Sequence, residues 1–317
     1  MKVSIIILNW NGGSVDCIES VQSALSQNYE NKEIIFVDNG STDSSCQAVK
    51  KKIPDIRFIE LKKNIGCPPG RNVGAQHATG DLIFFLENDG VWKDHTVVSS
   101  AVGIFRKFKK LGALYTMVEG YNTLEPDKPL DPFPSKNTIT GLYLSSSFRG
   151  GASIIRRDVF LSNNGFPDDF FRQSEERFLS LLIYNSGYKV AYWPIHSMRH
   201  KGSDYVGKTT TVLKYSIENN LKTVIRLYPL IPALVVGFSK WLVGNIALLK
   251  TGMLKDAISI NVNILKEILG KNHYQRISLK VFCEVETLRQ GYANNSYIDS
   301  GCDAESIAIL LFRRLFK

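Results

Sequence analysis

The sequence predicts an α/β fold: a doubly wound, mostly parallel sheet followed by a C-terminal helical region that associates with a membrane. Apolar runs rich in β-branched residues, such as Val3–Leu8 and Ile34–Val37, are typical of parallel strands buried on both faces. Between them, apolar residues recur with helical spacing at Ile18, Val21 and Leu25. Strands that alternate with helices indicate a parallel sheet covered on both sides.

The remaining strands follow from the same pattern. We predict strands at Arg57–Leu61, Leu82–Leu86, Arg149–Ile155 and Lys189–Trp193. Residues 119–148 interrupt this series with four closely spaced prolines among polar residues. Long loops in compact domains are commonly functional or mobile, so we expect this loop to shape the site.

The character of the sequence changes after about residue 210, which divides the chain into residues 1–210 and residues 211–317. The stretch Leu227–Leu249 carries one charge, Lys240, and is long enough to span a bilayer, although prolines and glycines interrupt it. The last residues, Ile307–Lys317, resemble a basic amphipathic anchor. We favour a surface-bound helical region over a membrane span or a buried helix pair.

Composition limits the classes of partner. The 317 residues carry a net charge of +9, which favours anionic partners such as nucleotides or lipid headgroups. No zinc-finger spacing or RNA-recognition motif is present, so we do not expect a nucleic-acid partner. The five cysteines include no CxxC pair and fit reduced thiols, and the first apolar run is too short for a signal peptide. We therefore expect a cytoplasmic protein.

Polar side chains gather where the predicted strands end. In open α/β sheets, ligands bind outside the carboxyl ends of the strands. The carboxylate of Asp38 can accept hydrogen bonds from a base imide or a ribose hydroxyl, although DNGSTD is also compatible with a plain turn. The residues at these ends are Asn9, Asn11, Asp38, Asn39, Ser41, Glu87, Asn88 and Asp89.

Two acids, Glu87 and Asp89, follow the apolar strand LIFFL. Carboxylate oxygens suit a hard divalent cation that leaves coordination positions open for phosphate. Such a cation can stabilise a departing diphosphate as a Lewis acid. The alternative is an acidic turn without a ligand.

Three segments resemble the nucleotide-binding half of a family 2 glycosyltransferase with the GT-A fold: VSIIILNWNG, IIFVDNGSTD and NIGCPPGRNVGAQHATGDLIFFLEND. The resemblance implies that Glu87-Asn88-Asp89 is the D-x-D metal motif, with Glu in place of the first Asp. Asp89 is then the direct ligand of Mg²⁺ or Mn²⁺, with Glu87 beside it. The nucleotide-binding residues we assign are Asn9, Asn11, Asp38, Asn39, Ser41, Asn64, Gly66, Arg71, Asn72 and Asn88.

The resemblance continues to about residue 205, through RGGASIIRRDVFLSNNGFPDDFFRQSEERFLSLLIYNSGYKV. Glu176 aligns with the acid that family members use as general base, and Glu175 precedes it. An acceptor hydroxyl is a poor nucleophile until its proton is removed. Two acids would also be favoured by the dipole at a helix N-terminus, and both roles can hold. His200 matches a histidine that in some relatives reaches the metal or diphosphate.

The implied function is an inverting glycosyl transfer from a UDP- or dTDP-sugar to a hydroxyl of a saccharide or lipid-linked acceptor in cell-surface polysaccharide synthesis. The protein would act on an anionic membrane surface, peripherally on the inner face of the cell membrane. Two alternatives stay open. One is a sugar-nucleotide-binding relative without turnover, because Glu175-Glu176 replaces the usual E-D pair. The other is a nucleotidyltransferase, which the absence of a basic triphosphate loop after the first strand disfavours.

A competing motif lies at Gly202–Thr209, which satisfies G-x-x-x-x-G-K-[ST]. A phosphate-cradling loop of that kind follows a buried strand and opens a helix, whereas the residues before Gly202 are polar and include a proline. We therefore expect no ATPase loop, and hypothesise that Lys208 helps to cover the diphosphate of a bound donor.

Overall fold

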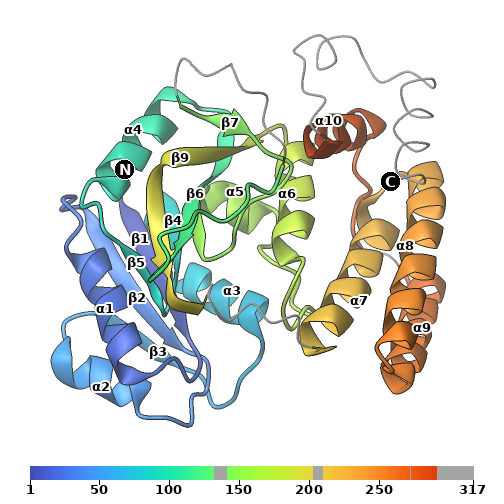
Figure 1. Ribbon diagram of the computed structural model, residues 1–317. Coiled ribbons are helices and arrows are strands. Elements are labelled where there is room, and N and C mark those ends of the chain that lie inside the picture. The colour runs from blue at the N-terminus through green and yellow to red at the C-terminus, as the bar shows by residue number, and fades with distance from the viewer. Residues whose placement is uncertain (132–140, 203–209, 272, 291–317) are drawn as a thin grey trace.

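The structure is a computed structural model, and it describes residues 1–131, 141–202, 210–271 and 273–290 (Figure 1). In these ranges nine strands form a single sheet of order β3-β2-β1-β4-β8-β6-β9-β5, with β7 beside β9. The strands are β1 (Val3–Asn9), β2 (Lys32–Asp38), β3 (Arg57–Glu60), β4 (Leu82–Glu87), β5 (Gly90–Trp92), β6 (Leu111–Gly120), β7 (Tyr143–Leu144), β8 (Ala152–Arg156) and β9 (Lys189–His200).

The sheet is parallel in its N-terminal half and mixed beyond it. Strands β3, β2, β1 and β4 pair in parallel, whereas β8 enters antiparallel between β4 and β6. Short strands β5 and β7 then pair antiparallel with β9, which itself runs parallel to β6. The prediction of an α/β fold is confirmed, and the structure adds β5, β6 and β7 to the strands expected from the sequence.

Helices cover both faces of the sheet, because successive side chains of each buried strand point to opposite sides. Ile5 and Ile7 of β1 belong to the core under α1 (Ser14–Leu25), α2 (Ser45–Lys52) and α4 (Val97–Lys107). Ile6 belongs to the core under α3 (Cys67–His77), α5 (Arg157–Ser162) and α6 (Glu175–Asn185). The apolar run at the start of the chain therefore serves two cores at once.

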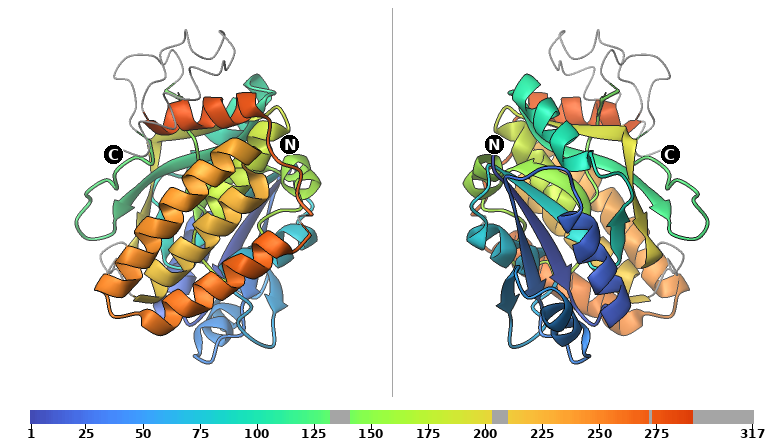
Figure 2. Two further views of the ribbon diagram at one scale, coloured as in Figure 1. Left: turned by 90° about the vertical axis from the view of Figure 1, so that its right-hand side faces the viewer. Right: turned by 90° about the vertical axis from the view of Figure 1, so that its left-hand side faces the viewer.

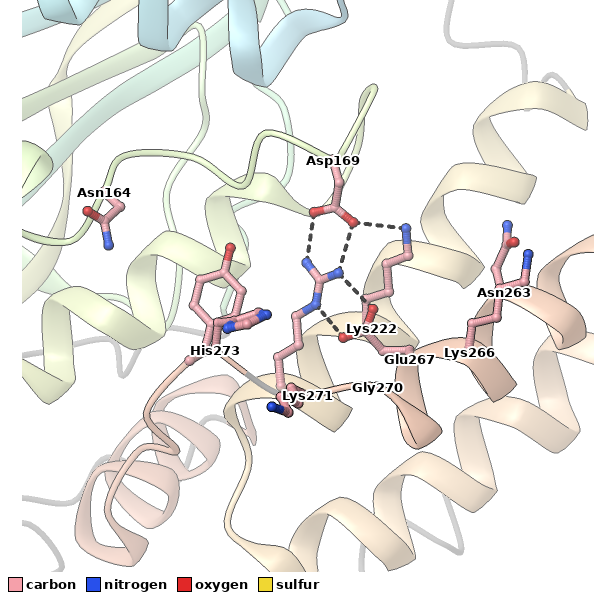
Figure 3. A pocket seen from close by; sticks show the side chains of 11 residues that line it. Asn164, Asp169, Lys222, Asn263, Lys266, Glu267, Gly270, Lys271 and His273 are labelled. Carbon is pink, nitrogen blue, oxygen red and sulfur yellow. Dashed lines mark hydrogen bonds and ion pairs between the residues drawn. The ribbon is translucent and has the colours of Figure 1, made fainter.

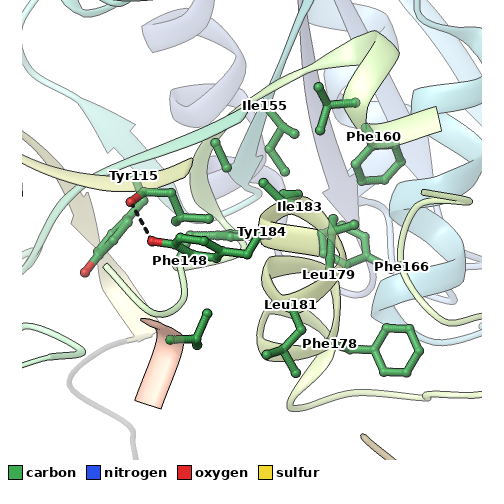
Figure 4. Close-up of a cluster of buried hydrophobic side chains, with 14 of the residues drawn as sticks. Tyr115, Phe148, Ile155, Phe160, Phe166, Phe178, Leu179, Leu181, Ile183 and Tyr184 are labelled. Carbon is green, nitrogen blue, oxygen red and sulfur yellow. Dashed lines mark hydrogen bonds between the residues drawn. The ribbon is translucent and has the colours of Figure 1, made fainter. Parts of the chain in front are cut away.

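An aromatic cluster holds the segment between α5 and α6 against the sheet. The rings of Phe85, Phe160 and Phe166 lie 5.3–5.7 Å apart between centroids, and Figure 4 shows Phe160 and Phe166 in this core. Asn164 and Gly165, at φ 61° and 66°, turn the chain so that Phe166 points inward. This turn sets the start of the loop that leads to α6.

Among the described residues, four helices follow the sheet: α7 (Thr210–Leu227), α8 (Leu230–Lys250), α9 (Leu254–Leu269) and α10 (Leu279–Gln290). Helices α7, α8 and α9 pack against one another through a small core that includes Leu221, Leu248 and Ile260. Figure 2 shows α8 and α9 on the outside of this layer. The start of α7 lies at the boundary predicted between residues 1–210 and 211–317, and that division stays a prediction.

Helix α8 corrects one expectation, since the prolines and glycines of the apolar stretch do not interrupt it. Pro229 is the N-cap and Pro232 lies in the first turn, where a proline removes no helical hydrogen bond. At Gly244 the missing side chain admits Ile217 of α7. Only 17% of the most apolar window of α8 is buried, which disfavours the alternative of a buried helix pair. Ile307–Lys317 lies outside the described residues.

The cysteines correct a second expectation. Cys17, Cys46 and Cys67 are free thiols, as predicted. Cys283 is disulfide-bonded, which the expectation of reduced thiols did not include.

Candidate functional site

The side chain of Asn9 joins three strand ends. Its Nδ2 donates to Asp38 Oδ1 at 2.9 Å, and its Oδ1 accepts from Asn88 Nδ2 at 2.8 Å and from the Gly12 amide at 3.2 Å. The parallel register explains the meeting, because Asn9 lies opposite Asp38 and Leu8 lies opposite Glu87. The ends of β1, β2 and β4 thus form one polar edge.

The DNGSTD turn is fixed on this edge. Asp38 is 6% exposed, and its Oδ2 accepts from the amide of Ser41 at 3.2 Å. Asn11, at φ 51°, accepts from the amide of Thr42 at 2.7 Å, and its own amide donates to Ser41 Oγ at 3.0 Å. The turn and the segment after β1 therefore hold each other in place, and their polar side chains lie along the edge of the sheet.

A second network extends the edge toward α3. Asn39 is 2% exposed and donates from Nδ2 to Asn64 Oδ1 at 3.1 Å and to the carbonyl of Gly66 at 3.0 Å. Gly66 has φ 99°, and a side chain there would collide with the backbone of Phe171. These contacts bring together the residues from both sequence segments that we assigned to the nucleotide.

Arg71 lies in a buried cluster of acids. Its Nη2 donates to Glu87 Oε1 at 2.7 Å, and its Nη1 lies 3.5 Å from Glu175 Oε1. Asn72, the next residue of α3, bonds the backbone of Phe166 and donates to Asp168 Oδ1 at 2.8 Å. Both residues connect elements inside the protein, and their assignment to the nucleotide stays a prediction.

Glu175 and Glu176 open α6 after a strained turn. Gln173 and Ser174 have φ of 73° and 69°, a left-handed conformation that costs a non-glycine residue roughly 1–3 kcal/mol. Burial and, to a smaller extent, the charge of Glu176 raise the pKa of Glu175 to about 8, against the opposing effect of Arg71. Burial also raises the pKa of Glu176, whereas Arg71 opposes this shift.

Gly150 and Gly151 make room for these acids. In the sequence they were visible only as two glycines within the predicted strand Arg149–Ile155. The amide of Gly150 donates to Glu176 Oε1 at 3.2 Å. A side chain at Gly150 would overlap Arg71 and Glu176, and one at Gly151 would overlap Glu87. Glycine inside a strand commonly marks such a close approach, and this was the signal available in the sequence.

Asp89 and His200 meet because β5 pairs with the end of β9. Asp89 Oδ1 lies 3.0 Å from His200 Nε2, and Asp89 Oδ2 accepts from the Gly202 amide at 3.0 Å. Burial favours a higher pKa for Asp89, but the hydrogen bond and charge of His200 hold the pKa below its ordinary value. Burial would lower the pKa of His200, but Asp89 and Glu87 raise it.

The predicted metal ligands are therefore only partly assembled. Asp89 and His200 are in contact, whereas Glu87 is paired with Arg71. Within the described part of the chain, no group of three or more His, Cys, Asp or Glu side chains could hold an ion. Most of the competing phosphate-loop motif, including Lys208, lies outside the described residues.

A cavity of about 350 Å³ lies between two acids of the site, Glu87 and Glu176. Its lining includes Glu87, Glu176 and His200, together with Gln173 of the strained turn and Arg177 of α6. Asp127 and Leu130 also line it, so the predicted long loop contributes to its wall. Sequence reasoning assigned no role to Gln173 or Arg177, although both lie within the segment that resembles the family.

Comparison with known proteins identifies the family of the chain. Residues 4–162, about half of the chain, match the model of glycosyl transferase family 2. An uncharacterized glycosyltransferase of Nostoc is 32% identical over 118 residues, which are 36% of each chain. The Escherichia coli protein WfaP, a UDP-Glc:alpha-D-GlcNAc-diphosphoundecaprenol beta-1,3-glucosyltransferase, is 43% identical over 93 residues, or 28% of this chain and 36% of WfaP. The aligned segments thus span about a third of these relatives.

Solved structures share the fold at low identity. Residues 1–349 of Staphylococcus aureus TarS, in complex with UDP-GlcNAc, superpose with a TM-score of 0.59 at 16% identity, covering 91% of this chain and 84% of that one. The Pyrobaculum calidifontis mannosyltransferase PcManGT, with GDP-Man and Mn²⁺, gives 0.58 at 17% identity, covering 99% and 87%. The fold is of the GT-A type.

The raised pKa of Glu175 predicts a pH-dependent effect of Glu175→Gln. The folded protein holds a proton on Glu175 up to about pH 8, so the stability that this group contributes is present below about pH 4.5 and is lost as pH rises toward 8. The difference in free energy of unfolding between the variant and wild type should therefore change by on the order of 1–3 kcal/mol in favour of the variant as the pH is raised from 5 to 8. Urea denaturation at both pH values measures this, with exposed Glu30→Gln as the control. A difference that does not change with pH would contradict the burial argument.

Proposed function

The chain belongs to glycosyl transferase family 2, and we propose that it transfers a sugar from a nucleotide-diphosphate donor to a hydroxyl of a saccharide or lipid-linked acceptor, with inversion at the anomeric carbon. One observation carries this proposal. Glu176, at the start of α6, shares a cavity with Glu87 and His200, which come from β4 and β9. A carboxylate with a raised pKa thereby lies near the groups assigned to the donor diphosphate.

The donor is proposed to lie along the polar edge of β1, β2 and β4. Asp38 and the Ser41 turn would bind the base and ribose, because their buried hydrogen bonds already fix their orientation. A UDP- or dTDP-sugar is our preferred donor. TarS was solved with UDP-GlcNAc and PcManGT with GDP-Man, so a guanosine donor also belongs in any test.

The residues present fit a divalent ion that is shared with the donor. Asp89 and His200 offer one oxygen and one nitrogen donor in contact with each other, and diphosphate oxygens and water would complete the shell. Glu87 would join if its bond to Arg71 loosens. When bound, Mg²⁺ or Mn²⁺ would supply positive charge for the departing nucleoside diphosphate. Among structural neighbours, GalNAc-T7 and PcManGT were solved with Mn²⁺.

The protein's own chemistry is a proton transfer. Glu176 accepts the proton of the acceptor hydroxyl while that oxygen forms a bond to the anomeric carbon. The bond between the anomeric carbon and the diphosphate oxygen breaks, and the nucleoside diphosphate leaves with its electron pair. Attack from the face opposite the leaving group inverts the configuration. Because burial raises the pKa of Glu176, the carboxylate is a stronger base than an exposed glutamate.

The proposed place of action is the inner face of a membrane. Helix α8 is the one helix of the described residues that is long and apolar enough to cross a bilayer, with mean hydropathy 1.5. Together with α9 it exposes many large apolar side chains: Leu230, Ile231, Leu234, Phe238, Trp241, Leu242, Val243, Ile246, Leu249, Leu254, Ile258, Val262, Leu265, Ile268 and Leu269. Exposed apolar patches of this kind mark interaction surfaces, and the net charge of +9 favours anionic lipids.

Donor binding can be tested by thermal stabilisation with UDP-, dTDP- and GDP-sugars. One nucleotide class should raise the melting temperature by roughly 5 °C at saturating ligand with Mn²⁺, and EDTA should reduce the shift. Asp89→Ala should lose the part of the melting-temperature shift that depends on the metal, whereas Asp55→Ala, at an exposed position, should behave as wild type. Equal shifts in Asp89→Ala and wild type would exclude Asp89 as a metal ligand.

The general base can be tested by substitution. Glu176→Gln should lower kcat, followed as release of nucleoside diphosphate, by about 10²–10⁴-fold without weakening donor binding. In wild type, kcat/KM should fall as pH decreases through the raised pKa of Glu176, because the protonated acid cannot accept a proton. A larger loss in Glu175→Gln than in Glu176→Gln would assign the proton transfer to Glu175.

Membrane association can be tested with vesicles. Full-length protein should sediment with vesicles that contain phosphatidylglycerol, and Phe238→Glu should lower the bound fraction about 10-fold because it places a charge on the apolar face. Val15→Glu on α1 is the matched control, since Val15 is 67% exposed and Phe238 63%. Release by carbonate at pH 11 would support surface binding over a span. Protein that stays in the supernatant would refute the association.

A further inference from the structure

The strained turn before α6 is held from outside the family-matched region. Gln173 and Ser174 both adopt left-handed backbone conformations, at φ 73° and 69°. Side chains other than glycine rarely adopt this conformation unless the surroundings impose it. The turn immediately precedes Glu175 and Glu176, so its geometry sets where the first turn of α6 points these acids.

Two consecutive asparagines of α7 contact the turn. Asn219 is 2% exposed, and its Nδ2 donates to the carbonyl of Arg172 at 2.8 Å and to the carbonyl of Gln173 at 2.9 Å. Asn220 donates from Nδ2 to Ser174 Oγ at 2.9 Å. One buried amide thus bonds two successive carbonyls of the turn.

The rest of the loop is fastened to the same helix. Asp169 pairs with Arg226 at 2.8 Å and with Lys222 at 3.1 Å, and Figure 3 shows the contact between Asp169 and Lys222. These residues line a cavity of about 680 Å³. The ring of Phe171 stacks on Tyr215 at 5.5 Å and 26°. Tyr215, Asn219, Lys222 and Arg226 are spaced as one face of a helix. Helix α7 therefore contacts the loop along most of its length.

The turn that α7 holds also forms part of the cavity wall beside Glu176. Gln173, Ser174 and Glu176 line the same 350 Å³ cavity. Releasing the turn would let α6 begin in another geometry and would move the Glu176 carboxylate away from the Gly150 amide, which it contacts at 3.2 Å. A displacement of about 1 Å in a catalytic group can lower a rate about 100-fold.

We propose that Asn219 is a positioning residue, which holds the left-handed turn at Gln173 and Ser174 so that Glu176 faces the acceptor side of the cavity. The role rests on the proposed function, because it acts through Glu176 as general base. It assigns to α7 a part in the reaction that none of the sequence motifs contains.

The test compares Asn219→Ala with two further variants in the full-length protein. Asn219→Ala should lower kcat for nucleoside diphosphate release about 10- to 100-fold, with the donor KM unchanged within about twofold. Thr223→Val is the matched control on α7, because the Thr223 hydroxyl donates only to the Asn219 carbonyl of its own helix. Adding Gln173→Gly and Ser174→Gly to Asn219→Ala should restore much of kcat, since glycine adopts positive φ without strain.

A second readout does not depend on activity. Amide hydrogen exchange of residues 172–176 should become faster in Asn219→Ala and stay unchanged in Thr223→Val. Unchanged amide hydrogen exchange of residues 172–176 in Asn219→Ala would refute the positioning role. The role would also be refuted if Asn219→Ala lowers kcat and raises the donor KM together, and the added glycine substitutions do not restore kcat. If wild type releases no nucleoside diphosphate from any donor, the proposed function fails, and exchange alone then decides whether Asn219 holds the turn.

Discussion

The site is organised around one buried guanidinium. Arg71 of α3 contacts Glu87 at the end of β4 and Glu175 at the start of α6, and its side chain is 4% exposed. Burying acids without a partner is strongly unfavourable, and removing one member of such a group leaves an unpaired charge. The positions of α3, β4 and α6 relative to one another are therefore coupled through this cluster.

The cluster also explains why the two glutamates at the start of α6 differ from ordinary helix-opening acids. Glu175 is buried and Glu176 is half-buried, and both lie near Arg71, which also bonds Glu87. The pKa values of Glu175 and Glu176 are raised because burial outweighs the charge of Arg71. Gly150 and Gly151 complete the arrangement, since any side chain there would occupy the space that the carboxylates fill.

The C-terminal helices have two different tasks in this structure. Helix α7 bonds the loop before α6 through Asn219, Asn220 and the Asp169 ion pairs. Helices α8 and α9 cover α7 and turn apolar side chains outward. The proposed membrane face is thus separated from the strained turn by a single helix. Any shift of α7 would reach the turn directly.

Much of the fold could be predicted because strong local signals coincided. Apolar β-branched runs marked β1, β2 and β4, and the polar residues after them met at one edge because parallel strands end on the same side. The family resemblance was equally local: it covers about residues 1–205, and the family model matches residues 4–162 of these. No local signal in the sequence indicated that β8 pairs antiparallel with β4, or that β5 and β7 pair with β9. Pairing between strands that are distant in the sequence depends on register.

The sequence by itself determined which residues are acidic, which are apolar and, to within two residues, where strands β1 to β4 begin and end. These are properties of neighbours along the chain. Only the tertiary structure decided that Arg71 pairs with Glu87, that Asp89 contacts His200, and that Asn219 reaches the turn before α6. The partners in these contacts lie 16, 111 and about 46 residues apart, and their meeting depends on helix packing and strand order, which no local pattern encodes.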